Sequence, residues 1–267
     1  MSKVVLITGG SSGIGKSIGE FLHHKGFVVY GTSRNPEKVL NSVFPLVALD
    51  VRNSDSIKNA VNRIIETSGR LDIVINNAGV GITGPLEEIP TEEIRNNFET
   101  NFFGPIEVMK AALPQMRKQN SGLIINVTSI AGYMGLPYRS VYSASKGALE
   151  LITEALRMEV KAFGVEITNV APGDFATNIA AGRYHAPVIK DSAYEKVYGD
   201  VLATMNDHVD AGSNPNEMAE AVYKIIQTKK PNVHYKVGAF MQKFSIVLKR
   251  ALPDKVYEKM LMNHYKL

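Results

Sequence analysis

The chain has 267 residues, of which 45% are hydrophobic, and 30 basic against 26 acidic residues give it a formal net charge of +4. This length and composition suit one α/β domain with a substantial core, so we expect a single domain over residues 1–267. The charge is mild and no basic run is interleaved with aromatic residues, which gives nucleic-acid binding little support. Cysteine is absent, which excludes disulfides and thiolate chemistry, and the six scattered histidines lack the paired spacing of a metal site, so we expect no metal.

The amino-terminal residues lead directly into an apolar, β-branched run at residues 4–7 and leave no room for a signal peptide. No uninterrupted apolar segment reaches the length of about 18 residues that a membrane-spanning helix needs. We therefore expect a cytoplasmic protein.

Predicted strands and helices alternate along the chain. Strands are expected at residues 3–8, 27–32, 44–50, 71–76, 122–129, 165–170 and 232–237, and helices at residues 13–25, 54–67, 92–118 and 140–163. This alternation predicts a doubly wound parallel sheet with helices on both faces and right-handed crossovers. A ligand crevice is expected at the carboxyl ends of the strands.

A glycine-rich run, TGGSSGIG, occupies residues 8–15 between the first predicted strand and the first predicted helix. In such a turn Gly9 allows the tight bend, Gly13 lets the backbone approach a pyrophosphate, and Gly15 lets helix and strand pack closely. The N–H groups at the start of the helix then bind the anion. A plain flexible turn is the alternative, but the flanking strand and helix favour a Rossmann-like phosphate cradle. Its predicted members are Gly9, Ser11, Ser12, Gly13, Ile14 and Gly15.

The end of the second predicted strand is the usual place for the residue that reads the adenosine ribose of a dinucleotide. An acid there binds the free hydroxyl of NAD, but this chain has Thr32, Ser33 and Arg34 and no acid. Two hydroxyls and a planar guanidinium suit the additional phosphate of NADP. NADP(H) is therefore the expected cofactor and NAD(H) the less favoured one; the alternative is that Arg34 is only a solvated loop charge.

Tyr142 and Lys146 stand four residues apart in a predicted helix, which puts both side chains on one face. A phenol has an ordinary pKa near 10, so protonating an alkoxide near pH 7 requires the phenolate to be stabilised by about 3 units, or roughly 4 kcal/mol. One ammonium at about 6 Å contributes about 2.8 kcal/mol at an effective dielectric of about 20. We therefore expect Lys146 to lower the pKa of Tyr142 and make it an acid for a carbonyl.

Further motifs follow in chain order. NNAG at residues 76–79 ends one predicted strand, Ser129 ends another, PGxxxT at residues 172–177 follows a third, and Asn101 lies in a predicted helix. Together with the glycine run, Tyr142 and Lys146, this ordered set resembles the classical short-chain dehydrogenase/reductase family. The resemblance extends over residues 8–177, and no catalytic position departs from the family pattern.

The resemblance implies a role for each motif. Tyr142 would exchange a proton with the substrate oxygen, Lys146 would hold the nicotinamide ribose, Ser129 would bind the substrate oxygen, and Asn101 would support a water that links Lys146 to solvent. The implied cofactor contacts are Asp50 and Val51 at the adenine, Asn77, Ala78 and Gly79 on the adenosine side, and Pro172, Gly173 and Thr177 at the nicotinamide. The structural alternatives are that Asn76 and Asn77 bind neighbouring backbone, Asp50 ends a strand and Ser129 caps the next segment.

Substrate choice is expected to depend on residues 80–90, 130–138 and above all 174–214. In the last region Tyr194, Val197, Tyr198, Val201, Leu202 and Met205 recur at helical spacing, as in a lid or in ordinary core. Nearby Phe175, Ile179, Tyr184, Tyr133 and Met134 predict apolar surroundings and a lipophilic ketone or alcohol. The extension at residues 240–267 is amphipathic and basic, which suits a membrane surface, the substrate crevice or another subunit.

These observations predict an NADP(H)-dependent oxidoreductase that reduces a lipophilic ketone of steroid, retinoid or 3-ketosphinganine type. The alternative is a non-catalytic NADP-binding sensor, which has no need for Asn101, Ser129, Tyr142 and Lys146 together. A small-molecule substrate is the expected partner. The resemblance further implies a homodimer or homotetramer, and the tail adds a possible peripheral membrane contact.

Overall fold

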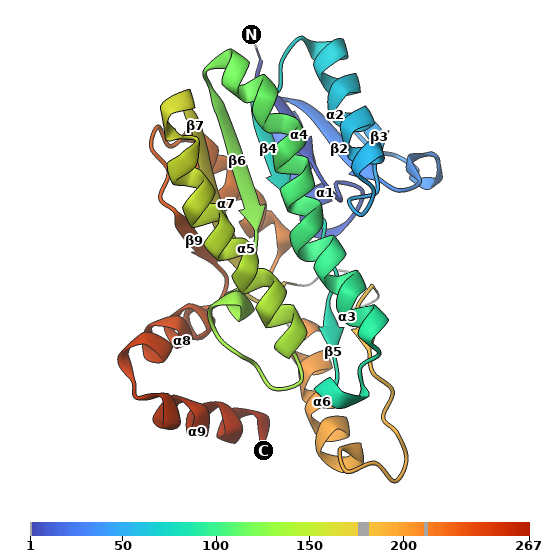
Figure 1. Ribbon diagram of the computed structural model, residues 1–267, viewed down its shortest axis with the longest axis vertical. Helices are drawn as coiled ribbons and strands as arrows, with labels where there is room; N and C mark the ends of the chain where they lie inside the picture. Colours follow the sequence, from blue (N-terminus) through green and yellow to red (C-terminus); the bar gives the residue numbers. More distant parts are fainter. Residues whose placement is uncertain (1, 176–181, 211–212) are drawn as a thin grey trace.

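The computed structural model describes residues 2–175, 182–210 and 213–267. Its centre is a seven-stranded sheet in which every neighbouring pair is parallel, as the alternating pattern predicted (Figure 1). The strand order is β3 (Leu46–Ala48), β2 (Val28–Ser33), β1 (Val4–Ile7), β4 (Ile73–Asn76), β6 (Gly122–Val127), β7 (Val165–Pro172) and β9 (His234–Val237).

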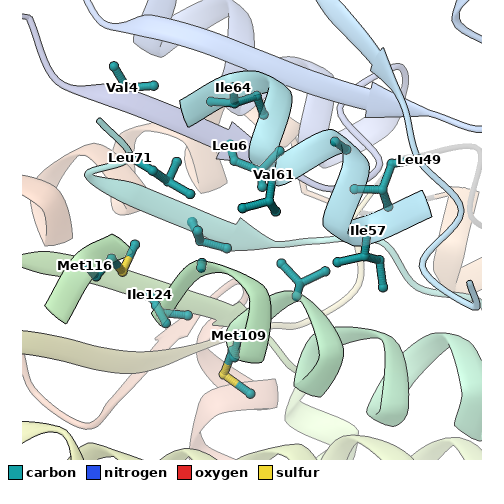
Figure 2. Packing of buried hydrophobic residues seen from close by; sticks show 14 of the residues in the cluster. Val4, Leu6, Leu49, Ile57, Val61, Ile64, Leu71, Met109, Met116 and Ile124 are labelled. Atoms are coloured by element: carbon teal, nitrogen blue, oxygen red, sulfur yellow. The ribbon is translucent and has the colours of Figure 1, made fainter. Parts of the chain in front are cut away.

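Helices cover both faces of the sheet, which confirms the doubly wound, Rossmann-like architecture. The helices α2 (Ser54–Ser68), α4 (Gly104–Gln119) and α5 (Ser140–Glu159) pack on one face, and α1 (Gly13–His24) and α7 (Pro215–Gln227) pack on the other. Figure 2 shows Ile57, Val61 and Ile64 of α2 directed at the sheet beside Leu6. The strands are apolar and β-branched because both of their faces are buried.

The strand order reverses between β1 and β4. From β1 the chain moves to β2 and β3 on one side, and it returns to β4 and β6 on the other. Because the connections on the two sides of this point diverge, a crevice opens at the carboxyl ends of β1 and β4. The glycine run and the NNAG motif lie at these two strand ends.

One long predicted helix, at residues 92–118, is divided in the structure. It consists of α3 (Thr91–Phe98), a π-helical segment η3 (Glu99–Phe103) and α4, and the Gly104 N–H donates to the carbonyl of Glu99 five residues back. Pro105 has no N–H to give to the carbonyl of Asn101, so the regular α-helical pattern cannot continue through this point. Asn101 therefore lies in an irregular turn.

Other predicted bounds differ at their ends. The strand predicted at residues 44–50 is only Leu46–Ala48, and the helix predicted at residues 140–163 stops at Glu159 before a separate turn, Lys161–Phe163. Helix α7 and the two-residue strands β5 (Ile82–Thr83) and β8 (Tyr184–His185) were not predicted. The short strands pair with each other outside the main sheet.

Three further helices lie beyond the carboxyl ends of the strands, at the lower end of the molecule in Figure 1: α6 (Glu195–Asp210), α8 (Phe240–Ala251) and α9 (Asp254–Tyr265). Most of the predicted apolar stripe is core: Tyr198, Val201 and Met205 are buried, whereas Val197 is exposed. The Tyr198 hydroxyl donates to the carbonyl of Ala186 at 3.0 Å. On the tail, Ile246 and Tyr257 pack against Ile130 and Met134. None of the helices in the described part of the chain has the length and apolarity to cross a membrane.

Candidate active site

A cavity of about 540 Å³ lies at the carboxyl ends of the strands. It is bordered by the turn after β1, the end of β2, the loop after β4 and one face of α5. The predicted cofactor residues that line it are Gly9, Ser11, Ser12, Gly13, Ile14, Ser33, Arg34, Asp50, Val51, Asn77, Ala78, Gly79, Tyr142, Lys146 and Pro172. Gly15 and Asn101 do not line it, Ser129 and Gly173 line a second cavity beside it, and Thr177 and Ile179 lie outside the described residues.

The glycine turn packs tightly against the loop after β4. Gly9 has a φ of 63° and Gly13 a φ of 53°, values that favour glycine, and a Cβ on Gly15 would meet the carbonyl oxygen of Gly9 at 2.4 Å. The Thr8 hydroxyl accepts the N–H groups of Asn77 and Ala78, each at 3.0 Å, and the Asn77 amide donates to the carbonyl of Thr8 at 3.0 Å. Asn77 therefore ties two loops together as well as bordering the cavity.

The start of α1 faces this cavity with its first N–H groups. Ser12 precedes the helix in an extended conformation and makes no capping hydrogen bond through its side chain. The N–H groups of a helix's first turn have no partners within the helix, and together with the helix dipole they attract an anion. This end of the cavity fits a phosphate group.

Arg34 and Arg52, which follow the ends of β2 and β3, form the part of the cavity that we call the cationic corner. Ser33 and Arg34 border the cavity beside Asp50 and Arg52, and Arg52 Nη2 lies 3.3 Å from Asp50 Oδ2. Burial acts to raise the pKa of Asp50, but the hydrogen bonds and charge of Arg52, with the charge of Arg34, outweigh it and lower the pKa. Arg52 was missed at the sequence level, although it stands only two residues after Asp50.

Thr32, one member of the predicted phosphate pocket, makes a hydrogen bond within the protein. Thr32 is buried and its hydroxyl accepts the N–H of Gly9 at 3.2 Å, so it ties β2 to the glycine turn. The Ser33 hydroxyl accepts the N–H of Asn35 at 3.2 Å and keeps its own proton to donate. The Thr32 hydroxyl likewise keeps its own proton to donate, and Thr32 also borders the cavity, where Arg52 adds a second guanidinium.

Ser129, Tyr142 and Lys146 come together where the first cavity meets the second. Ser129 and Tyr142 both border the second cavity, and Ser129 acts to lower the pKa of Tyr142. Ser129 Oγ accepts the N–H of Ala131 at 3.2 Å, so the predicted cap is present too. Lys146 Nζ donates to the carbonyl of Val127 at 3.0 Å and lies 6.0 Å from the centre of the Tyr142 ring. One turn of α5 and the loop after β6 therefore gather the three side chains.

The expected lowering of the Tyr142 pKa by Lys146 is wrong for the protein without a ligand. Burial raises the pKa of Tyr142, and the neighbouring Ser129 hydroxyl and the charges of Arg139 and Arg183 oppose this without reversing it. Burial also lowers the pKa of Lys146 to about 8, although the carboxylate of Glu150 acts to raise it. Both groups are held away from water, which disfavours the charged form of each.

Asn101 is fully buried in η3 and its side chain is used by neighbouring backbone. Its Oδ1 accepts the N–H of Val80 at 2.9 Å, and its Nδ2 lies 2.9 Å from the carbonyl of Val80 and 3.3 Å from Ser145 Oγ. These bonds fix the loop after the NNAG motif. Asn101 Oδ1 and Lys146 Nζ both lie close to Gly79, at 3.2 and 3.3 Å from where a Cβ would be.

The second cavity, of about 80 Å³, begins at Ser129 and Tyr142 and has a lining of both apolar and charged residues. Arg139, Arg183 and Asp174 border it together with Phe175. Of the residues expected to make these surroundings apolar, Phe175 and Tyr184 line the two cavities, whereas Tyr133 and Met134 pack under the tail helices. The charged residues Arg139, Arg183 and Asp174 were not expected there. No periodicity marks the two arginines, because loops that are distant in sequence bring them together.

The tail helix α8 closes the far side of this region. A Cβ on Gly173 would lie 1.9 Å from Gln242 Oε1, so only glycine allows this approach. The Gln242 amide donates to Asp174 Oδ2 at 2.7 Å. Of the three settings expected for the tail, the structure shows contact with the edge of the crevice, while Phe240 and Met241 on its other side stay exposed.

Residues 3–187 match the sequence profile of a family described as short chain dehydrogenase. The chain belongs to this short-chain dehydrogenase/reductase family. It is 40% identical to a 3-ketodihydrosphingosine reductase of Bacteroides thetaiotaomicron over 266 residues, which cover 99% of this chain and 98% of the relative. Members of the family are oxidoreductases that act on alcohols and carbonyls.

Solved structures of the family have the same fold. A short-chain dehydrogenase from Streptomyces avermitilis matches with a TM-score of 0.84 and 30% identity, covering 100% of this chain and 96% of that one. A short-chain dehydrogenase from Burkholderia cenocepacia in complex with NADP matches with a TM-score of 0.76 and 26% identity, covering 99% and 97% of the two chains.

Proposed function

We propose that this protein is an NADP(H)-dependent oxidoreductase that reduces the carbonyl of a small, lipophilic molecule. One observation carries the proposal: Tyr142 borders both cavities, with Ser129 beside it in the second cavity and Lys146 one helical turn away. A proton donor thus lies between a space that fits a dinucleotide and a space open to a second molecule. Family membership supports the same reaction class.

The first cavity fits a nicotinamide dinucleotide. Its volume of about 540 Å³ lies in the range of sites for cofactors and small molecules. The glycine turn offers bare backbone and an uncapped helix start to the pyrophosphate, and the relative from Burkholderia cenocepacia is described as bound to NADP.

The cationic corner supports NADP(H) over NAD(H). Arg34 and Arg52 supply two guanidinium groups beside the free hydroxyl proton of Ser33, and no acid stands at the end of β2 to bind a ribose hydroxyl. Asp50 is engaged by Arg52, so its negative charge is compensated at this corner. NADPH is the usual reducing pool, which favours the reductive direction.

Each side chain of the site has its own role in the reaction. When bound, the nicotinamide supplies the hydride. Tyr142, kept protonated by its raised pKa, donates its proton to the carbonyl oxygen, and Ser129 donates a hydrogen bond to the same oxygen as charge develops there. Lys146 holds the ribose hydroxyls and, with a pKa of about 8, is mainly cationic near pH 7. Asn101 fixes Val80, and the family resemblance gives it the further role of supporting a water that would link Lys146 to solvent.

The experiment for this function is Tyr142→Phe. Loss of the proton donor is expected to lower kcat by a factor of about 10² to 10⁴, because general acid catalysis contributes that much. NADPH binding, followed by NADPH fluorescence, is expected to stay within about twofold. Tyr223→Phe, in a ring cluster on α7 with Phe21 and Phe27, is the matched control and should keep full activity. Full activity of Tyr142→Phe would remove the mechanism.

Several observations together support a long-chain keto-lipid as the substrate. The relative from Bacteroides thetaiotaomicron is named a 3-ketodihydrosphingosine reductase, and its similarity spans 99% of this chain. The apolar side chains around the crevice, including Phe175 and Tyr184, suit a hydrocarbon chain. Among steroid, retinoid and long-chain keto-lipid substrates, these supports favour the keto-lipid.

A non-catalytic NADP sensor is the second candidate. It is favoured only if NADPH binds tightly and a panel of ketones gives no NADPH oxidation. The placement of Ser129, Tyr142 and Lys146 around the two cavities argues against it, since a sensor has no need for a proton donor there.

We further propose a peripheral contact of α8 with anionic membrane surfaces and a cytoplasmic location. Phe240 is 72% exposed and Met241 is 66% exposed, and the rings of Phe240 and Phe244 stack with centroids 5.7 Å apart. Lys243 and Lys249 belong to the same helix. Exposed apolar side chains among basic ones suit a lipid surface, from which a lipid substrate is collected.

A homodimer or homotetramer is the proposed assembly. Leu151 is 68% exposed and Met158 is 73% exposed, one heptad apart on the outer side of α5. Phe103 of η3, which packs against α5, is also exposed. Large exposed apolar side chains on packed elements are typical of a subunit interface.

A further inference from the structure

The second cavity holds more charge than a hydrocarbon substrate needs. Arg139 ends the loop before α5, Arg183 lies just before β8, and Asp174 follows the carboxyl end of β7. All three border the cavity together with Ser129 and Tyr142. We call these five residues and Phe175 the head-group pocket.

Each guanidinium in this pocket has a buried nitrogen without a hydrogen-bond partner. The atoms are Arg139 Nε and Arg183 Nη1. Buried polar groups are nearly always hydrogen-bonded, and an unpaired charged donor is costly to keep. The two cations also repel each other: burial, and then the charge of Arg139, lower the pKa of Arg183. Acceptor atoms supplied by a ligand relieve both costs.

The position of Arg183 is tightly constrained by the loop after β4. A Cβ on Gly81 would lie 2.8 Å from both Cγ and Nε of Arg183, so the side chain lies directly on the backbone of Gly81. Gly81 borders both cavities. The guanidinium is therefore held beside the place where the reacting carbonyl meets Tyr142.

Asp174 supplies the complementary charge. Its Oδ2 accepts from the amide of Gln242 at 2.7 Å, and its own N–H donates to Gln242 Oε1 at 3.3 Å. Helix α8 thus fixes the carboxylate at the edge of the pocket. The guanidinium groups of Arg139 and Arg183 can only donate hydrogen bonds, and the carboxylate of Asp174 can only accept them. A matching ligand therefore brings both acceptors and a donor.

The size of the pocket limits what enters it. A volume of about 80 Å³ is far below the roughly 300 Å³ at which drug-sized sites begin. It admits a few polar atoms next to the carbonyl and excludes a fused ring system. The hydrocarbon part of the substrate must then extend away from this pocket.

We propose that the head-group pocket binds a short polar head beside the reacting carbonyl, with oxygen acceptors at Arg139 and Arg183 and a hydroxyl or amine donor at Asp174. The inference rests on the proposed function and narrows its substrate class to long-chain ketones with a polar head. Steroids, retinoids and plain hydrocarbon ketones are poor substrates.

The first experiment compares ketones on one carbon skeleton with the wild-type protein and NADPH. The probes are octadecan-3-one, 1-hydroxyoctadecan-3-one, 2-aminooctadecan-3-one and 2-amino-1-hydroxyoctadecan-3-one. We expect kcat/KM to rise at least tenfold with each added polar group. Equal kcat/KM for all four ketones would overturn the inference and leave the proposed function intact.

The second experiment changes the pocket. Arg183→Gln and Arg139→Gln are each expected to lower kcat/KM at least tenfold for the hydroxyl-bearing ketones and less than twofold for octadecan-3-one. Asp174→Asn should act in the same way on the amine-bearing ketones. The matched control is Arg117→Gln, whose guanidinium stacks on Phe163 away from both cavities. Equal losses of kcat/KM for the ketones with a polar head and for octadecan-3-one would overturn the inference.

The third measurement separates binding from turnover. Kd values of the four ketones are measured with the Tyr142→Phe variant saturated with NADPH, from the change in NADPH fluorescence. If no ketone is turned over by the wild-type protein, the proposed function fails, while tighter binding of the headed ketones still supports the pocket. Equal Kd values for the four ketones would contradict the pocket whatever the turnover.

Discussion

Glu150 lies one helical turn beyond Lys146 and is buried in a polar cluster. It is bonded to the Thr128 hydroxyl, and its Oε2 lies 2.7 Å from His234 Nδ1, while His234 Nε2 lies 2.9 Å from Glu154 Oε1. Both ring nitrogens of His234 thus face carboxylates. This cluster keeps a fixed negative charge behind Lys146, and that charge raises the pKa of Lys146 against the effect of burial.

The pH dependence of the reaction tests this arrangement. Lys146 must be cationic to hold the ribose, and its pKa of about 8 predicts that kcat/KM falls as pH rises through this value. Glu150→Gln removes the charge that raises the pKa, so the alkaline fall is expected at lower pH. The measurement is kcat/KM between pH 6 and pH 10, with exposed Glu159→Gln as control. An alkaline fall at the same pH in both variants would show that Glu150 does not act on Lys146.

Cofactor choice is a second test at the scale of single residues. Arg34→Ala removes a guanidinium from the cationic corner, and charge-assisted hydrogen bonds of about 1.5–3 kcal/mol predict a 10- to 100-fold rise in the Kd of NADPH. The Kd of NADH should change less than twofold. Arg63→Ala, on the exposed side of α2, is the matched control. If wild-type protein binds NADH and NADPH equally, Arg34 has no role in cofactor choice.

At the scale of helices and strands, the sequence predicted the elements that are determined by local residue patterns. Apolar runs and glycine turns gave the central strands and α1, α2 and α5 within a few residues. The division at η3 was missed because the hydrophobic period continues through Asn101, and only Pro105 marks the break. Helix α7 begins with a recognisable signal, Asn214 followed by Pro215, directly at the end of the loop region predicted over residues 174–214.

Helix α8 has two sides with different uses. Ile246 and Gln242 face the molecule, whereas Phe240, Met241 and Phe244 remain exposed. The double variant Phe240→Ser with Phe244→Ser is expected to lower binding to anionic liposomes at least fivefold, because exposed apolar area drives such contacts. Co-sedimentation measures it, with Leu40→Ser plus Val43→Ser, two exposed residues of another loop, as control. Equal binding by both double variants would reject membrane contact through α8.

The site as a whole was only partly readable from sequence. Its cofactor half lies on motifs with fixed spacing, so residues such as Gly9 and Lys146 were predicted to border one cavity and do so. The head-group pocket combines Arg139, Asp174 and Arg183 with a tail helix, and no spacing rule connects such distant segments. The head-group pocket is formed by tertiary contacts, which a single sequence does not show.

The assembly is tested at the scale of the whole molecule. Leu151→Glu with Met158→Glu places two charges in the exposed apolar strip on α5 and is expected to convert the oligomer to monomers. A buried unpaired charge is costly at an interface, so a loss of association by at least 100-fold is expected. Light scattering after size exclusion measures the mass, with Leu40→Glu as control. A monomeric wild-type protein would contradict the proposal.

Asp174 is held at the edge of the second cavity by Gln242 of α8. One side of α8 makes this contact, while the other side exposes Phe240 and Met241. Any change in the placement of α8 therefore moves the carboxylate that borders the substrate space, and whatever binds the outer side of this helix also acts on that space.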